Sequence, residues 1–307
     1  MLPAAGVGAG LWWAGRLLVA AGPLPETREV VIPRGGPETV AAALLAAGVI
    51  GHDRLFLAGS WWTRAEGPLR AGEFAFPAGA SLRDALTLLR TARPVQHRLT
   101  IPEGLTAAQI ALLVDRAEAL SGDPPVPGEG EILPQTYAFE RGMPRAALLE
   151  RASRAMERTL AEAWARRTPD LPLASPAELV TLASIVERET SRPEERAAVA
   201  GVYINRLRRG MRLQADPTVA YAASGGASLD RAPTRADLDQ PHPYNTYRVA
   251  GLPPGPIASP GAASIAASAR PMVHDYLYFV ADGNGGHVFA RTLEEHNRNV
   301  ARWRAGR

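Results

Sequence analysis

The chain has 307 residues, of which 46% are hydrophobic, and it carries a formal net charge of +3. This length allows one large domain or two modest ones. The absence of cysteine excludes disulfides, thiol nucleophiles and thiolate metal sites. Lysine is absent as well, so all 34 basic residues are arginine, which excludes a lysine Schiff base and lysine-bound pyridoxal phosphate. Because no dense basic run with interleaved aromatic residues occurs, nucleic acid is not an expected partner.

The N-terminal segment 2–22 is apolar except for Arg16. Its length is near the lower limit for a membrane-spanning helix, and a charge at the bilayer centre is costly. No basic region precedes it, which disfavours a cleaved signal peptide. We therefore predict a membrane anchor over residues 1–22 with Arg16 near an interface. Everything after Pro23 is then expected outside the cytoplasm, in a single-pass protein of the cytoplasmic (inner) membrane.

The next segment predicts a small α+β unit, for which we expect the boundaries 28–94. Its hydrophobic pattern indicates two strands that flank two helices, followed by a further helix with Ser81 as its N-cap. The expected strands and helices cover residues 29–33, 37–47, 53–61 and 70–76. This β-α-α-β order over about fifty residues is typical of a compact binding module.

The remaining segment, 95–307, predicts a mixed α+β domain. Its first elements are a strand, a helix and a loop rich in proline, glycine and acidic residues. Its last elements are a strand, a hairpin turn, a returning strand and a closing helix. In chain order these cover residues 95–101, 106–120 and 121–130, then 275–281, 282–286, 287–290 and 294–304.

A helix with a clear start lies in the middle of this second domain. Ser175 is followed by Pro176 and Glu178, which predicts a capping box with proline at the first helical position. At 100° per residue, Glu187 and Glu189 both fall within the apolar arc of this helix, on opposite flanks. Burying a carboxylate is costly unless it is paired or protonated. Either an arginine partner or an acid held protonated for glycosidic cleavage fits this pattern.

A second helix and then three polar loop segments are predicted after this helix. Ser191 and Glu194 predict a second capping box, with a helix that ends at Gly210. The loops that follow are rich in proline, and their Asn, Thr and Tyr side chains offer donors, acceptors and ring faces that suit sugars. They could form a rigid cleft wall or an ordered structural loop. They cover residues 211–219, 241–247 and 251–261.

Other chemistries find no support in the sequence. The six histidines form no pair at metal-ligand spacing, so no metal site is expected. Ser60 and Ser184 lack the glycines of a nucleophile elbow. The sequence therefore predicts neither a metal nor a cofactor.

Six short segments, in chain order, resemble the motifs of the endolytic murein transglycosylases of the YceG-like family. They are residues 182–190 (LASIVERET), 202–207 (VYINRL), 211–219 (MRLQADPTV), 244–247 (YNTY), 251–255 (GLPPG) and 278–283 (YFVADG). Residues 100–104 and 133–137 match more loosely, and Gln135 stands where an acid is usual. The resemblance covers nearly the whole chain from Val30.

The resemblance implies a small LysM-like module followed by a catalytic domain in which a central helix carries the catalytic glutamate. It implies an enzyme, a lyase, that cleaves nascent peptidoglycan strands internally between N-acetylmuramic acid and N-acetylglucosamine. The products would carry 1,6-anhydro-N-acetylmuramic ends, and strand elongation would stop. Peptidoglycan strands, the cytoplasmic membrane and cell-wall synthases are the implied partners.

By this resemblance Glu187 is the catalytic glutamate, and Glu189 is expected to pair with an arginine and fix the helix. The expected substrate-binding residues near Glu187 are Gln214, Asn245, Thr246 and Tyr247. Two alternatives remain. The first is a pyridoxal-phosphate lyase, against which the absence of lysine argues. The second is a non-catalytic peptidoglycan-binding scaffold in which Glu187 belongs to a structural ion pair.

Overall fold

The computed structural model describes residues 15–227 and 231–306, and it divides the chain into two compact units. The first unit comprises Met1–His97 with Ala138–Met143, and the second comprises Arg98–Tyr137 with Pro144–Arg307. Most of the predicted anchor, residues 1–14, lies outside the described residues. Within the described part of the chain, no helix combines the length and apolar character needed to cross a membrane.

The first unit has the β-α-α-β order predicted from the sequence. Strands β1 (Arg28–Ile32) and β2 (Gly72–Phe76) pair antiparallel, with Val30 opposite Phe74. Helices α2 (Pro37–Ala46) and α3 (Asp53–Trp62) lie between them in sequence, followed by the short 3-10 helix η1 (Arg64–Glu66). Their buried faces share one core, formed mainly by Ile32, Leu44, Phe56, Phe74, Phe76, Leu86 and Leu89.

Helix α4 (Leu82–Thr91) confirms the N-cap predicted at Ser81. The Ser81 hydroxyl accepts a hydrogen bond from the Asp84 amide, and the Asp84 carboxylate accepts one from the Ser81 amide. This reciprocal cap satisfies two backbone donors at the start of the helix. Ala85, Leu86 and Leu89 follow on one face and enter the core of the first unit.

The second unit is mixed α+β, as predicted. Strands β5 (Tyr278–Ala281) and β6 (His287–Ala290) form an antiparallel hairpin within it. Strands β3 (Gln96–Thr100) and β4 (Thr136–Glu140) form a separate two-stranded sheet, whose residues are divided between the two units. The other described elements of the second unit are helical. They are α5 (Ala107–Asp115), α6 (Arg145–Ala165), α7 (Pro176–Glu189), the 3-10 helix η2 (Pro193–Glu195), α8 (Arg196–Arg208), α9 (Asp216–Ser224), α10 (Arg235–Asp239), α11 (Ala262–Ala269) and α12 (Leu293–Ala305).

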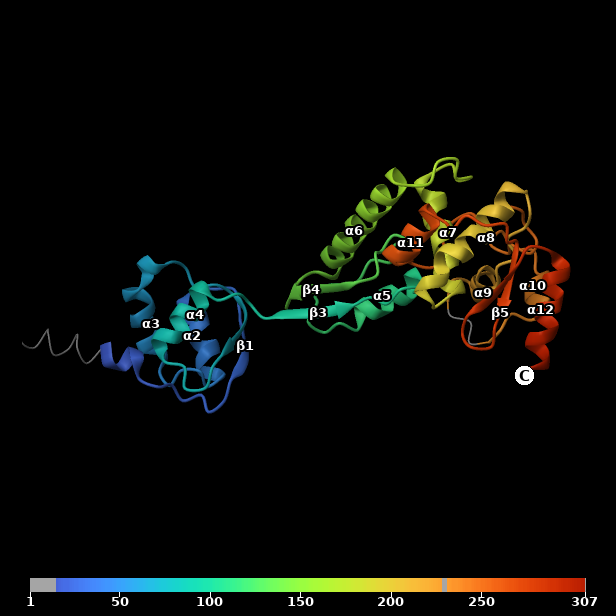
Figure 1. Cartoon of the computed structure of the whole chain (residues 1–307). Coiled ribbons are helices and arrows are strands. Elements are labelled where there is room, and N and C mark those ends of the chain that lie inside the picture. The colour runs from blue at the N-terminus through green and yellow to red at the C-terminus, as the bar shows by residue number, and fades with distance from the viewer. Residues whose placement is uncertain (1–14, 228–230, 307) are drawn as a thin grey trace, which may run out of the picture. The chain divides into compact units, whose positions relative to one another are not determined.

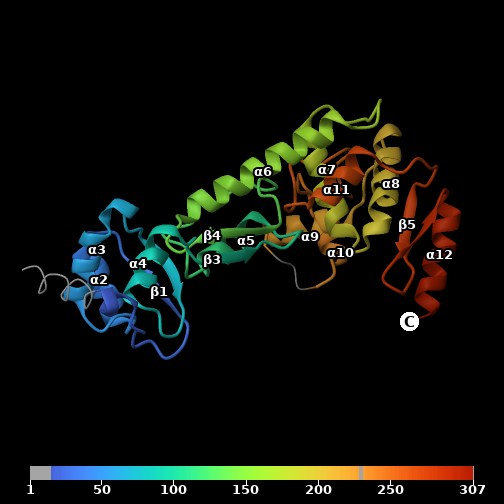
Figure 2. The same cartoon turned by 60° about the vertical axis from the view of Figure 1, so that its left-hand side comes forward.

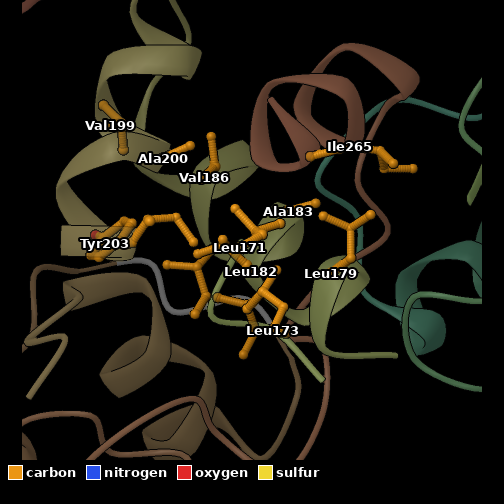
Figure 3. Close-up of a cluster of buried hydrophobic side chains, with 14 of the residues drawn as sticks. Leu171, Leu173, Leu179, Leu182, Ala183, Val186, Val199, Ala200, Tyr203 and Ile265 are labelled. Carbon is orange, nitrogen blue, oxygen red and sulfur yellow. The ribbon is translucent and has the colours of Figure 1, made fainter. Parts of the chain in front are cut away.

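Helix α7 is the centre of the second unit. It packs against α6, α8, α9 and α11, and α12 covers the β5–β6 hairpin (Figures 1 and 2). All residues of α7 from Leu179 to Val186 are buried, including Thr181 and Ser184. Figure 3 shows the cluster that results, with α7 contributing Leu179, Leu182, Ala183 and Val186. A helix buried on almost every side fixes the orientation of the side chains at its end.

The predicted starts of α7 and α8 need correction. At α7 the Ser175 hydroxyl accepts from the Glu178 amide, but the Glu178 carboxylate accepts from the Ala174 amide, so only half of the predicted box forms. At α8 the predicted box is wrong. Residues 193–195 form η2, and α8 begins after Glu195 without a side-chain cap. The Glu195 carboxylate accepts a hydrogen bond from the His287 amide and also bonds Nδ1 of the His287 ring.

Three helices that pack against α7 were absent from the elements predicted by pattern: α6, α9 and α11. Helix α9 begins within residues 211–219, which were expected to form a loop. The 21-residue helix α6 has no side-chain N-cap, and α11 follows the proline-rich loop with only eight residues, AASIAASA. Small residues on α11 allow close approach to α7 and α8, where Ser264, Ile265, Ser268 and Ala269 are buried. Tertiary packing rather than local propensity therefore stabilises α11.

The α7 core predicts a large cost for removing one of its side chains. Leu182 is fully buried in the cluster of Figure 3, so Leu182→Ala should lower the free energy of unfolding by about 2–5 kcal/mol. Chemical denaturation followed through a probe in the second unit measures this change. The control is Leu112→Ala, which removes a half-exposed leucine and should cost less than about 1 kcal/mol. Equal effects of the two substitutions would contradict the central position of α7.

Candidate active site

The two glutamates at the end of α7 lie in different environments. They are two residues apart on a helix, so their side chains leave the axis about 200° from one another. Glu187 meets α8 and the loop before α11, whereas Glu189 lines a cavity whose walls come from α8, the 211–219 segment, β5 and α12. The environment of each glutamate therefore decides what it can do.

Glu187 is held in an ion pair. Its Oε1 lies 3.0 Å from Nη2 of Arg196, and its Oε2 accepts a hydrogen bond of 2.9 Å from the amide of Gly261. Only 5% of the Glu187 side chain is exposed. Both carboxylate oxygens therefore have a hydrogen-bond donor from another element of the fold. Glu187 thus joins α7 to α8 and to the N-cap of α11.

A second carboxylate completes this cluster. Glu103, in the turn before α5, lies 3.1 Å from the same Nη2 of Arg196. Burial and the neighbouring Glu187 carboxylate raise the pKa of Glu103. A Cβ at Gly261 would lie 1.9 Å from Oε1 of Glu103, so a side chain at this position would displace the Glu103 carboxyl group. The cluster thus gathers two carboxyl groups around one guanidinium.

Glu189 faces a cavity of about 360 Å³. Arg206, Gln214, Asp216 and Tyr247 place polar groups on its wall. The remaining lining residues are largely aromatic or apolar: Tyr203, Leu213, Tyr278, Phe279, Leu293, His296 and Asn297. Aromatic faces combined with a few amide and hydroxyl groups are typical of a pocket for a small polar ring compound.

The Glu189 carboxyl is the most perturbed acid of this cavity. Burial, and to a smaller extent the charge of Asp216, raise its pKa to about 7 against the opposing effects of Tyr203 and Arg206. Its Oε2 is inaccessible to solvent and has no hydrogen-bond partner among the described residues, although Tyr203 lies close by. Within the same part of the chain no arginine approaches Glu189 closely enough for an ion pair. The expected Glu189–arginine pair is therefore wrong, and the ion pair forms at Glu187.

Arg206 is held by backbone groups around the cavity. Its Nε donates to the carbonyl of Leu277 at 2.6 Å, and its Nη1 donates to Leu213 and to Oε1 of Gln214 at 2.8 and 3.2 Å. The guanidinium also lies 5.1 Å from the ring centroid of Tyr278. These contacts join α8, β5 and the 211–219 segment, so Arg206 builds the cavity wall.

Gln214 and Tyr247, two of the predicted substrate-binding residues, line the cavity of Glu189. Gln214 has a backbone φ of +48°, a conformation that is uncommon for a residue with a side chain. The hydroxyl of Tyr247 donates a 2.6 Å hydrogen bond to Asp216. Both residues thus share the cavity wall with Glu189.

Asn245 and Thr246 have a structural role in the same loop. Both are fully buried. The Asn245 amide donates to three carbonyls, those of Asp237, Leu238 and Gln240. The Thr246 hydroxyl accepts from the Ala215 amide and bonds the Thr218 hydroxyl. These two residues hold the loop that presents Tyr247, and in this structure their polar groups are not available to a substrate.

Several cavity residues were missed by sequence reasoning. Tyr203, Arg206, Asp216 and Tyr278 all lie in the segments that carried the family resemblance, yet none was assigned a role. Their positions in those segments were the only signal, because they belong to three different elements that only the fold brings together. In the described part of the chain no three histidine, aspartate or glutamate side chains form a group that could hold a metal ion.

The fold and this cavity define a two-unit α+β protein with a buried, protonatable acid in a polar and aromatic pocket. The sequence profile of the YceG-like family matches residues 30–302, and the chain belongs to this family. It is 48% identical over 121 residues to the endolytic murein transglycosylase of Bacillus subtilis (strain 168), an alignment that covers 39% of this chain and 33% of that protein.

A longer alignment connects the chain with a second relative. The endolytic murein transglycosylase of Streptococcus pneumoniae serotype 2 (strain D39) is 31% identical over 322 residues, covering 89% of this chain and 57% of that protein. The chain thus spans between a third and somewhat more than half the length of these relatives. A crystal structure of a yceG-like protein from Listeria monocytogenes superposes with a TM-score of 0.55 at 28% identity, covering 89% of this chain and 99% of that one.

The buried position of Asn245 predicts that its substitution changes stability. Asn245→Ala removes a fully buried amide that donates to the carbonyls of Asp237, Leu238 and Gln240 and should lower the free energy of unfolding by about 1–3 kcal/mol. Thermal unfolding of the purified variant measures the effect. The matched control is Asn284→Ala in the exposed β5–β6 turn, which should leave the melting temperature nearly unchanged. An unchanged melting temperature for Asn245→Ala would contradict this role.

Proposed function

We propose that this protein is an endolytic peptidoglycan lytic transglycosylase. It would cleave glycan strands between N-acetylmuramic acid and N-acetylglucosamine and leave 1,6-anhydro-N-acetylmuramic ends. Family membership and the names of the two relatives support this proposal. The observation that carries it is Glu189, a buried acid with a pKa of about 7 on the wall of a cavity that contains amide and aromatic groups.

We assign the general acid to Glu189 in place of Glu187. A general acid must hold a proton near neutral pH and must face the reacting oxygen. Glu189 meets both conditions, because burial favours its protonated form and its side chain lines the cavity. Glu187 is bound to Arg196 through one carboxylate oxygen and to the Gly261 amide through the other, so both oxygens are occupied by protein groups.

The reaction needs no external nucleophile. Glu189 donates its proton to the glycosidic oxygen as the bond from C1 of the muramic sugar breaks, and positive charge develops on that sugar. The Glu189 carboxylate then takes the proton from the C6 hydroxyl of the same sugar, whose oxygen bonds to C1. Because the nucleophile belongs to the substrate, the ring closure is intramolecular, and the proton returns to Glu189.

Gln214 and Tyr247 are the proposed sugar contacts beside Glu189. Gln214 Oε1 accepts from Arg206, which fixes the amide and leaves its nitrogen as a donor for a sugar hydroxyl or acetamido group. The rings of Tyr247, Tyr278 and Phe279 offer faces on which a pyranose can lie. Asn245 and Thr246 support the site indirectly by holding the Tyr247 loop.

The first unit supports a binding role beside this chemistry. Its β-α-α-β order suits a LysM-like module that holds a glycan strand. We place the protein's action outside the cytoplasm, where peptidoglycan is built. An anchor in residues 1–22 would keep the site near the membrane from which new strands emerge.

Substitution of each glutamate by glutamine distinguishes the two assignments. Glu189→Gln should lower strand cleavage about 10²- to 10⁴-fold, because an amide cannot donate the proton. Glu187→Gln should retain most of the activity of the folded protein while it loses about 1–3 kcal/mol of stability through its contact with Arg196. Mass spectrometry of digested glycan strands measures the anhydro ends, and thermal unfolding measures stability.

The opposite pattern, with Glu187→Gln inactive and Glu189→Gln active, would return the role of acid to Glu187. If the wild-type chain yields no anhydro ends from intact strands, the protein is a binding scaffold and the proposed activity is wrong.

The pH dependence follows from the same carboxyl. Cleavage needs protonated Glu189, so kcat/KM should fall as pH rises through its pKa of about 7, by ~10-fold for each further pH unit. Initial rates between pH 5 and pH 9 measure this limb. A limb that begins near pH 4.5, the ordinary value for glutamate, would show that Glu189 is not the titrating acid.

A further inference from the structure

We propose that Asp216, held in place by the hydroxyl of Tyr247, is a positioning residue that acts through Glu189 and keeps the proton on it. This inference rests on the proposed function for its catalytic consequence. Among the described residues that line the cavity, Asp216 is the one carboxylate besides Glu189. Asp216 begins α9 and Glu189 ends α7, so the tertiary fold brings these two residues to the same cavity.

Asp216 is fixed by two features of its position. The Tyr247 hydroxyl donates to its Oδ1 at 2.6 Å, and burial raises the pKa of Tyr247, so that the phenol remains a donor. Asp216 is also the first residue of α9, where the helix dipole favours negative charge. A carboxylate held in this way keeps a constant position relative to the opposite wall of the cavity.

Every element around Glu189 contributes a titratable or charged group. Helix α8 contributes Tyr203 and Arg206, α9 contributes Asp216, the loop after α10 contributes Tyr247, β5 contributes Tyr278, and α12 contributes His296. Arg206 is the one guanidinium of this lining, and its Nε and Nη1 donate to carbonyls and to Gln214. These two donors are engaged with the cavity wall, and among the described residues Arg206 forms no ion pair with Glu189.

The balance of charge on Glu189 consequently favours the neutral acid. Burial is the largest influence, and the charge of Asp216 is the next. Tyr203 and Arg206 act in the opposite direction with smaller effect. Burial is a property of the whole fold, whereas Asp216 is a single group that can be neutralised without changing the shape of the cavity. After each ring closure the same charge would favour return of the C6 hydroxyl proton to Glu189.

The test is a titration of Glu189 in the full chain by ¹³C NMR of labelled glutamate carboxyl groups, with the resonance assigned by its loss in Glu189→Gln. Asp216→Asn keeps the shape and can still accept from Tyr247. It should lower the Glu189 midpoint by about one pH unit, because removal of a nearby negative charge favours ionisation. The alkaline limb of kcat/KM should move to lower pH by the same amount. Asp115→Asn, an exposed aspartate outside the cavity lining, is the matched control and should move neither.

A second variant keeps the inference testable if Asp216→Asn does not fold. Tyr247→Phe removes the bond that holds Asp216 and should move the Glu189 midpoint in the same direction by a smaller amount. An unchanged midpoint in a folded Asp216→Asn protein, or an equal shift in the Asp115→Asn control, would overturn the inference. Because the NMR midpoint does not need turnover, a shifted midpoint supports the role of Asp216 even if wild-type chain fails to cleave strands. Such a failure would overturn the proposed function alone.

Discussion

The structure depends on the cost of burying carboxylates on a helix that is covered on almost every side. Helix α7 ends with two glutamates, and the fold meets the cost of each in a different way. Glu187 remains with a charged partner, Arg196, and with the Gly261 amide. Glu189 has no ion-pair partner among the described residues, so burial favours its protonated form. One helix end therefore provides a rigid support and a proton donor two residues apart.

The ion pair at Glu187 matters to the cavity because it fixes the elements that form the cavity wall. Arg196 is the first residue of α8, and the same helix carries Tyr203 and Arg206 to the cavity about two and about three turns further on. Arg206 then holds the 211–219 segment and Leu277, the residue before β5. The buried amide of Asn245 and the hydroxyl of Thr246 fix the loop of Tyr247. Hydrogen-bond networks of this kind give the site a defined geometry.

Most elements of the fold were predictable where local chemistry sets them. The Ser81 cap, the β-α-α-β order and the β5–β6 hairpin follow from capping residues, hydrophobic period and turn glycines, which act over a few residues. The misses have tertiary causes. Helix α11 is short and is stabilised by packing against α7 and α8. The second predicted capping box, Ser191 with Glu194, is wrong because residues 193–195 form η2 and α8 begins only after Glu195.

The sequence by itself determined that α7 exists, where it begins and that two carboxylates lie on its apolar arc, since a cap and a 100° period are local properties. It also determined which segments matter, because Gln214, Asp216, Tyr247 and Tyr278 all belong to the motifs of the resemblance. Only the tertiary structure decided which glutamate meets an arginine and which meets a cavity. That choice depends on Arg196, Gly261 and the cavity walls, which come from several separate elements, and desolvation is a property of the assembled fold.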